Sequence, residues 1–149
     1  MCDERVVHPD PSPFTGPTSE RHAHLDPVPA SVSLARAFVR AAEPELTTDA
    51  LDTLVLLTSE LVTNAVLHAR TPVRLDVVMG DEQVMVAVGD LAPVEQSLEP
   101  RHWSKDRPGG RGLALVADLS DAWGTRTHSG GKAVWFVLPV TQVVQLQVG

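Results

Sequence analysis

The feature that most constrains the fold is the stretch 50–69, which contains neither glycine nor proline. Thr48 or Asp49 is expected to cap it, because such side chains accept hydrogen bonds from the first helical N–H groups. Its apolar residues cover most of the circumference at about 100° per residue, so we predict a helix that is buried on almost every side. One polar line runs along this helix, made of residues four apart that stack on one face: Glu60, Asn64 and His68.

The remaining sequence alternates between patterns of period two, which predict strands, and apolar stripes at helical spacing. In chain order we expect a strand at 20–26, a helix through Ala42 capped by Ser31 or Ser33, the helix 50–69, strands at 73–79 and 84–88, a loop at 91–108, a helix at 113–120, and strands at 122–127 and 132–138. This order predicts an α+β fold, a two-layer sandwich in which three helices cover one face of a mostly antiparallel mixed sheet.

The chain length of 149 residues is that of one domain. Residues 1–18 are rich in proline and are expected to form a flexible tail, followed by the domain at 19–140 and a second tail at 141–149. The formal net charge of -7 argues against a protein that coats nucleic acid, since such proteins carry a basic patch. The single cysteine, Cys2, excludes a disulfide framework and a multi-cysteine zinc site.

The apolar content also bears on membranes. No apolar run approaches the roughly 18 residues that span a bilayer, and the polar first residues show no signal peptide. We therefore expect a cytoplasmic protein with no membrane contact and no direct contact with nucleic acid. The histidines near the N-terminus have no carboxylate or cysteine set at ligand spacing, so no metal site is expected there.

A glycine-rich turn at 109–112 precedes the predicted helix at 113–120. Glycines at the start of a helix let the backbone approach a ligand closely, and the first helical N–H groups then point at a phosphate. The turn is not a Walker loop, because no Lys-Ser or Lys-Thr pair follows, and a loop rather than a strand precedes it, unlike a dinucleotide fingerprint. Since glycine turns before helices are common, this one taken alone is a weak signal for a phosphate site.

Asp90 follows the strand 84–88, where a strand end would present its carboxylate over a cleft. An Asp at such a place is most often a turn residue, and a polar line in a buried helix is often a hydrogen-bonded part of the core. Asp90 gains interest from its position in the chain, between the polar helix and the glycine turn.

Taken together, Glu60-x-x-x-Asn64, Asp90 after a strand, and Gly110-x-Gly112 after a long loop resemble the Bergerat ATP-binding fold of gyrase-type ATPases, histidine kinases and chaperones. The stretch from Glu60 to Ala69 is similar to the anti-sigma-factor serine/threonine kinases and to the actinobacterial stand-alone ATP-binding regulators. The resemblance covers about residues 20 to 139, and it includes the closing segments Trp123-Gly124 and Gly131-Lys-Ala-Val-Trp135.

The resemblance implies a role for each matching residue. Asn64 would coordinate the Mg²⁺ ion on the ATP phosphates, Glu60 would act as general base on the attacking hydroxyl, and Asp90 would accept a hydrogen bond from the adenine amino group. The remaining nucleotide-binding positions that it implies are His68, for which we derive no chemistry, and the phosphate-holding residues Gly110, Arg111, Gly112 and Leu113.

At the level of the whole protein, the resemblance implies a homodimeric serine/threonine protein kinase with ATP and Mg²⁺ as cofactors. It would phosphorylate an anti-sigma-factor antagonist and bind a sigma factor. One departure leaves an alternative open, because the family's first glycine box, Asp-x-Gly-x-Gly, is Asp90-Leu-Ala-Pro93 in this chain. A nucleotide-dependent partner switch without catalysis is the second interpretation. A third, a structural domain that does not bind nucleotide, is opposed by the presence of all the matching residues.

Overall fold

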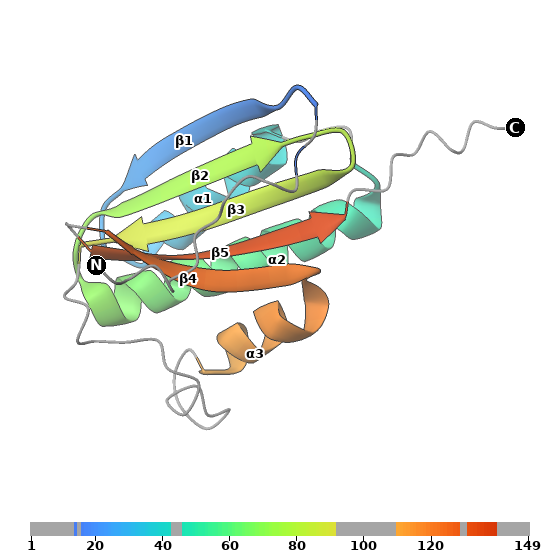
Figure 1. Cartoon of the computed structure of the whole chain (residues 1–149). Coiled ribbons are helices and arrows are strands. Elements are labelled where there is room, and N and C mark those ends of the chain that lie inside the picture. The colour runs from blue at the N-terminus through green and yellow to red at the C-terminus, as the bar shows by residue number, and fades with distance from the viewer. Residues whose placement is uncertain (1–13, 15, 43–45, 92–109, 129–130, 140–149) are drawn as a thin grey trace, which may run out of the picture.

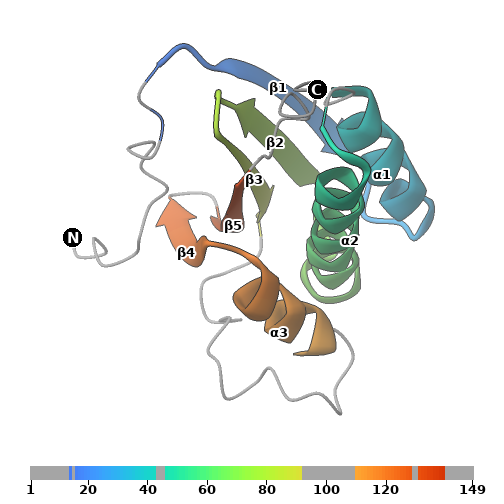
Figure 2. The same ribbon diagram turned by 90° about the vertical axis from the view of Figure 1, so that its right-hand side faces the viewer.

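The computed structural model describes residues 14, 16–42, 46–91, 110–128 and 131–139. They form the predicted α+β sandwich, in which helices cover one face of a five-stranded sheet (Figures 1 and 2). The elements in chain order are β1 (Ser19–Leu25), α1 (Ala30–Ala42), α2 (Thr48–Asn64), the π-helical turn η2 (Ala65–Ala69), β2 (Val73–Met79), β3 (Gln83–Asp90), α3 (Gly110–Leu119), β4 (Ala122–His128) and β5 (Gly131–Pro139).

The sheet has the order β1-β2-β3-β5-β4, and each neighbouring pair is antiparallel. Strand β3 is central, with β2 on one side and β5 on the other. This pairing brings the end of β3 beside the start of β5, although about forty residues separate them in the sequence. Residues from the later part of the chain therefore lie beside residues from the earlier part at this end of the sheet.

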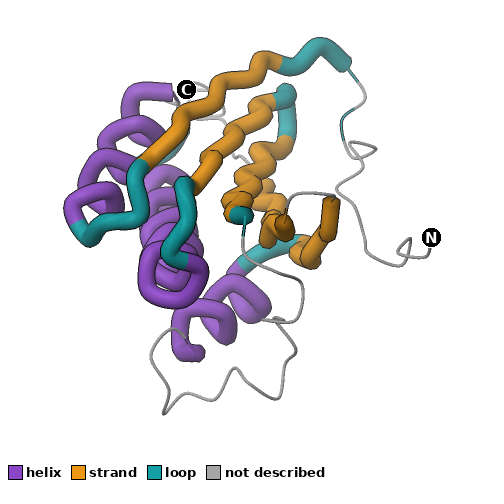
Figure 3. Tube along the Cα trace, turned by 90° about the vertical axis from the view of Figure 1, so that its left-hand side faces the viewer, coloured by secondary structure: helices purple, strands orange, loops and turns teal. Residues whose placement is uncertain are grey.

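The core lies between the sheet and the helices, which all sit on the same side of the sheet (Figure 3). Every second residue of the central strands faces this layer and is buried, as period two requires. These residues are Val84, Val86 and Val88 on β3, and Val134, Phe136 and Leu138 on β5. Burying side chains of this size contributes about 1.5–3 kcal/mol each, so this layer fixes the position of α2 on the sheet.

Helix α2 confirms the predicted long helix, with two differences at its ends. Its N-cap is Thr47, whose hydroxyl oxygen accepts a hydrogen bond from the N–H of Ala50 at 3.1 Å, so the predicted caps Thr48 and Asp49 were wrong. After Asn64 the helix widens into η2, and the N–H of Arg70 bonds to the carbonyl of Ala65 at 3.4 Å. The chain must leave the helix here, because the residue before a proline, Thr71, disfavours α-helical geometry.

The first helix and the third also begin earlier than predicted. Helix α1 starts at Ala30, so Ser31 lies in its first turn rather than at its cap, and the Ser31 hydroxyl donates to the carbonyl of Asp26 at 2.7 Å. Helix α3 starts at Gly110 rather than at Leu113. The predicted loop 91–108 lies outside the described residues except for Leu91, and so do most of the predicted tail 1–18 and all of the predicted tail 141–149.

The prediction that α2 is buried on almost every side was wrong on one side. Leu56 is 38% exposed, and Leu67, in η2, is 47% exposed. The combined segment Thr48–Ala69 is long and apolar enough to cross a membrane by length and composition, contrary to our expectation for this chain. Since 56% of its most apolar window is buried inside the protein, its apolar character is that of a core helix packed on a sheet.

Candidate functional site

The C-terminal ends of α2 and β3 lie at the same end of the molecule, at the left of Figure 1. The turn η2, which continues α2, packs against β3, and α2 packs against α3 as well as against β3 and β5. Asn64 is the last residue of α2 and Asp90 is the last residue of β3. The fold thus brings the polar helix, the strand-end carboxylate and the helix that carries the glycine pair into one group of packed elements.

Asn64 is the predicted site residue whose environment most directly indicates a ligand contact. Its side chain is buried, with 9% of its surface exposed, and its Oδ1 atom has no hydrogen-bond partner among the described residues. Leaving a buried acceptor unsatisfied costs about 1–3 kcal/mol, so such an oxygen is normally kept for a reason. An amide oxygen is a ligand that Mg²⁺ accepts, alongside phosphate oxygens and water. The residue therefore fits the predicted contact with magnesium-bound phosphates.

Glu60 lies one turn before Asn64 within the regular part of α2. Because both residues belong to the same unbroken α-helix, they lie on one stripe as predicted. The side chain of Glu60 is half-buried, between exposed Leu56 and fully buried Leu57. The carboxylate therefore stands at the border of the core, where a substrate can reach it.

His68 lies beyond the end of α2, in the turn η2, where the hydrogen-bonding pattern changes from i→i+4 to i→i+5. Its side chain is exposed. The predicted place of His68 on the polar line and its predicted contact with nucleotide stay predictions.

Asp90 is paired with a lysine that the sequence analysis placed in a closing segment of the resemblance but to which it assigned no role. Its carboxylate oxygen Oδ1 accepts a hydrogen bond from Nζ of Lys132 at 3.1 Å, and both side chains are buried. The two residues are directly opposed in the antiparallel pair of β3 and β5. A signal was present in the sequence, because Lys132, Val134 and Phe136 follow one another at intervals of two residues, so period two places them on one face of the last strand.

The glycine pair lies in the first turn of α3 instead of in a turn before it. The first N–H groups of a helix have no partner within the helix, so the backbone of Gly110 and Gly112 retains the predicted ability to donate to an anion. The structure describes the helical backbone of Arg111 and Leu113 but not their side chains. Their predicted contacts with phosphate stay predictions.

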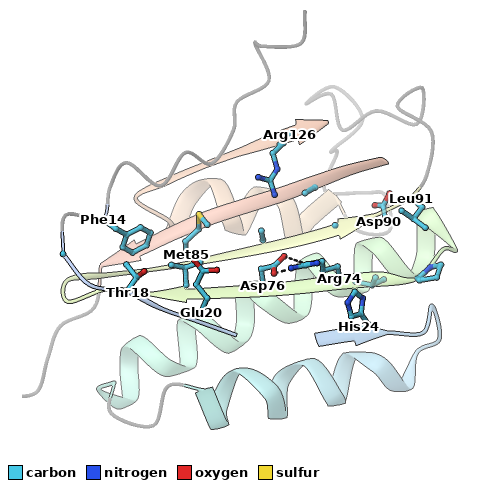
Figure 4. A pocket seen from close by; sticks show the side chains of 17 residues that line it. Phe14, Thr18, Glu20, His24, Arg74, Asp76, Met85, Asp90, Leu91 and Arg126 are labelled. Carbon is cyan, nitrogen blue, oxygen red and sulfur yellow. Dashed lines mark hydrogen bonds and ion pairs between the residues drawn. The ribbon is translucent and has the colours of Figure 1, made fainter. Parts of the chain in front are cut away.

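A groove of about 800 Å³ lies on the opposite face of the sheet, away from α2 (Figure 4). Arg74 and Asp76 form an ion pair on its floor, with Nε 3.0 Å from Oδ2, and this hydrogen bond raises the pKa of Arg74 above its ordinary value. Asp90 and Leu91 lie at one end of the groove. Glu60 and Asn64 are not among its lining residues, so the groove is separate from the predicted phosphate contacts.

Among the residues that the structure describes, no group of three or more His, Cys, Asp or Glu side chains could hold a metal ion. A resident metal site made of protein ligands is therefore not found in this part of the chain. A magnesium ion that arrives with a nucleotide needs only one or two protein ligands, because phosphate oxygens and water supply the rest. The side-chain amide of Asn64 suits a magnesium ion that arrives with a nucleotide.

A comparison with protein-family models matches residues 25–138 to the histidine kinase-like ATPase domain. The chain belongs to this family. The match runs from the last residue of β1 to the last core residue of β5, so it covers every element that builds the site. It confirms the Bergerat-type ATP-binding fold that the motifs predict. A comparison with curated proteins gives no match.

Proposed function

We propose that this chain binds Mg-ATP at the junction of α2, β3 and α3 and phosphorylates a serine or threonine of a partner protein. The partner is an anti-sigma-factor antagonist, and the kinase, as a cytoplasmic homodimer, also binds a sigma factor. The observation that carries the proposal is the buried, unpartnered Oδ1 of Asn64, one helical turn from Glu60 in a histidine kinase-like ATPase domain.

Each element of the site has one task in binding. Asn64 presents its amide oxygen to the magnesium ion, which supplies charge neutralisation on the phosphates when bound. Backbone N–H groups at the start of α3 donate to the phosphate oxygens. Asp90 accepts a hydrogen bond from the amino group of adenine. These contacts hold the γ-phosphate still, which is the main requirement of phosphoryl transfer.

Glu60 performs the proton transfer. The partner's hydroxyl oxygen attacks the γ-phosphorus as its proton passes to the Glu60 carboxylate. The bond between the γ-phosphorus and the bridging oxygen of ADP breaks, so ADP leaves and the partner keeps the phosphoryl group. A carboxylate at the border of the core suits this role, since it must meet both the bound nucleotide and a protein substrate that arrives from solvent.

Incubation of the purified chain with γ-labelled Mg-ATP and a candidate antagonist tests the kinase proposal. We expect label on a serine or threonine of the antagonist with native protein and none with Asn64→Ala. Label that appears equally with Asn64→Ala would contradict the assigned site. Binding of Mg-ATP without any transfer to the antagonists tried would favour the second function below.

A second function, a nucleotide-dependent partner switch without catalysis, is supported by the segment that follows Asp90. The family's hinge glycines are absent there, and the N–H of Leu91 is held by the hydroxyl of Thr71 at 2.8 Å. A backbone that is held at Leu91 and lacks these glycines adapts to a nucleotide less readily than a glycine hinge. In this case partner affinity would differ between the ATP- and ADP-bound forms, with no phosphoprotein formed.

A further inference from the structure

The core-facing row of paired residues between β3 and β5 ends in an ion pair. Along this row the opposed residues are apolar, ending with Val88 opposite Val134. The next opposed pair on the same face is Asp90 with Lys132, whose side chains are 8% and 9% exposed. A buried ion pair is often no more stable than an apolar pair of the same size. Its presence at the end of an apolar row therefore calls for a role beyond stability.

We propose that Lys132 is a nucleotide-specificity residue, which donates a hydrogen bond to ring nitrogen N1 of adenine while Asp90 accepts one from the 6-amino group. This inference rests on the proposed function, because it places adenine at Asp90. It assigns the second half of base recognition to a residue for which the resemblance implies no role.

The hydrogen-bonding pattern of the pair supports this role. A carboxylate only accepts, and an ammonium only donates. The bond to Asp90 uses one of the three N–H donors of Lys132. The pair thus presents an acceptor and a donor side by side, and the edge of adenine presents the complementary donor at position 6 and acceptor at position 1. Guanine, placed in the same orientation, would face Asp90 with a carbonyl oxygen and Lys132 with an N–H.

The ion pair also prepares the site for binding. Lys132 keeps the Asp90 carboxylate in a fixed place before the base arrives, since the two are joined at 3.1 Å within a rigid antiparallel pair. Gly131, next to Lys132, lets β5 lie directly against the backbone of Asp90, where no side chain would fit. Both polar groups are therefore set by the sheet, which reduces the ordering that binding must impose.

Calorimetry with native protein and two nucleotides tests the contact without any mutation. Mg-1-deaza-ATP has a C–H in place of N1 and keeps the 6-amino group. We expect it to bind on the order of ten- to hundredfold more weakly than Mg-ATP, as for the loss of a hydrogen bond to a charged group. Equal affinity for the two would overturn the role of Lys132 and leave the proposed function standing. Failure to bind either would overturn both.

The variant Lys132→Met connects the discrimination to this side chain. It should bind ATP and 1-deaza-ATP equally, both at about the affinity that native protein has for the analogue. If Lys132→Met still bound ATP more tightly than 1-deaza-ATP, the proposal would be overturned. It would also be overturned if the variant bound ATP more tightly than native protein does, because Lys132 would then compete with adenine for Asp90. Arg74→Met is the matched control, because it also removes a cation paired with an aspartate, on the other face of the sheet. It should keep the native preference for ATP.

Discussion

The backbone carbonyl of Asp90 lies directly against Gly131, so closely that a Cβ at position 131 would be 2.0 Å from the Asp90 oxygen. Gly131 has φ +157°, in a region that side chains rarely adopt. Two independent constraints, contact and backbone conformation, therefore demand glycine where β5 begins. The same contact holds the strand end that carries the proposed adenine-binding carboxylate.

The variant Gly131→Ala should therefore lower stability. A residue held in a glycine-only conformation costs about 1–3 kcal/mol, and the collision with the Asp90 backbone adds to that cost. For a chain of this size each kcal/mol shifts Tm by about 2–4 °C, so calorimetry should show a Tm at least several degrees lower.

The control for this prediction is Gly89→Ala, one residue before Asp90. A Cβ at position 89 would lie 3.6 Å from the Cβ of Ala133, which is ordinary contact. Glycine inside a strand is itself less favourable than alanine, so this variant should keep or slightly raise Tm. An equal fall in Tm for both variants would mean that the close approach at Gly131 has no special cost.

The sequence predicted the fold because its local patterns agree with each other. The strand periodicity and the long apolar helix each select one element, and their order allows few arrangements. The residues at which helices begin were predicted less accurately than the elements themselves, because several neighbouring residues can serve as caps. Thr47, Thr48 and Asp49 are all good capping residues, and the sequence alone does not rank them. The glycines at the start of α3 are weak helix formers, yet the helix, which packs on α2, includes them.

Some relationships between site residues could be predicted from the sequence and others could not, for a physical reason. Glu60 and Asn64 are related by helix geometry, which is local and can be derived from spacing. The partner of Asp90 depends on which strands pair and in what register, and that pairing joins residues far apart in the sequence. The exposed side of α2 was missed because no local pattern tells which part of an apolar helix its neighbours leave uncovered.

A second prediction concerns Asn64→Ala, which should separate binding from stability. The substitution removes a buried oxygen that has no partner in the described part of the chain, and alanine favours helix. We expect the free energy of unfolding to stay within about 1 kcal/mol of the native value, while magnesium-dependent ATP binding is lost in calorimetry. Equal ATP affinity of native protein with and without magnesium would contradict the metal contact.

Thr58→Val is the matched control for Asn64→Ala on the same helix. Its Oγ1 atom is also buried without a partner in the described structure, and Thr58 is fully buried. Valine has nearly the same shape, so removing this hydroxyl should raise stability by about 1 kcal/mol. Because Thr58 lies on the other side of α2 from Glu60, ATP binding should be unchanged.

A third prediction concerns the stability of the buried ion pair. Asp90→Leu alone leaves the Lys132 ammonium buried without its counter-charge, which should cost about 3–5 kcal/mol. The double variant Asp90→Leu/Lys132→Met extends the apolar row instead, and it should recover native stability or exceed it, as measured by urea unfolding. It should still fail to bind ATP. A double variant no more stable than Asp90→Leu would show that the pair is needed for folding itself.

The last prediction separates binding from chemistry at Glu60. Glu60→Gln keeps the size and most of the hydrogen-bonding capacity of the side chain but removes its basicity. General-base catalysis contributes roughly 100- to 10,000-fold in rate, so the variant should bind Mg-ATP normally and phosphorylate the antagonist at least about a hundredfold more slowly. Asp52→Asn is the control, since it neutralises an exposed carboxylate two turns earlier on α2, and its rate should match that of native protein. If Glu60→Gln transfers phosphate at the native rate, Glu60 is not the base, and a different group must take the proton from the hydroxyl.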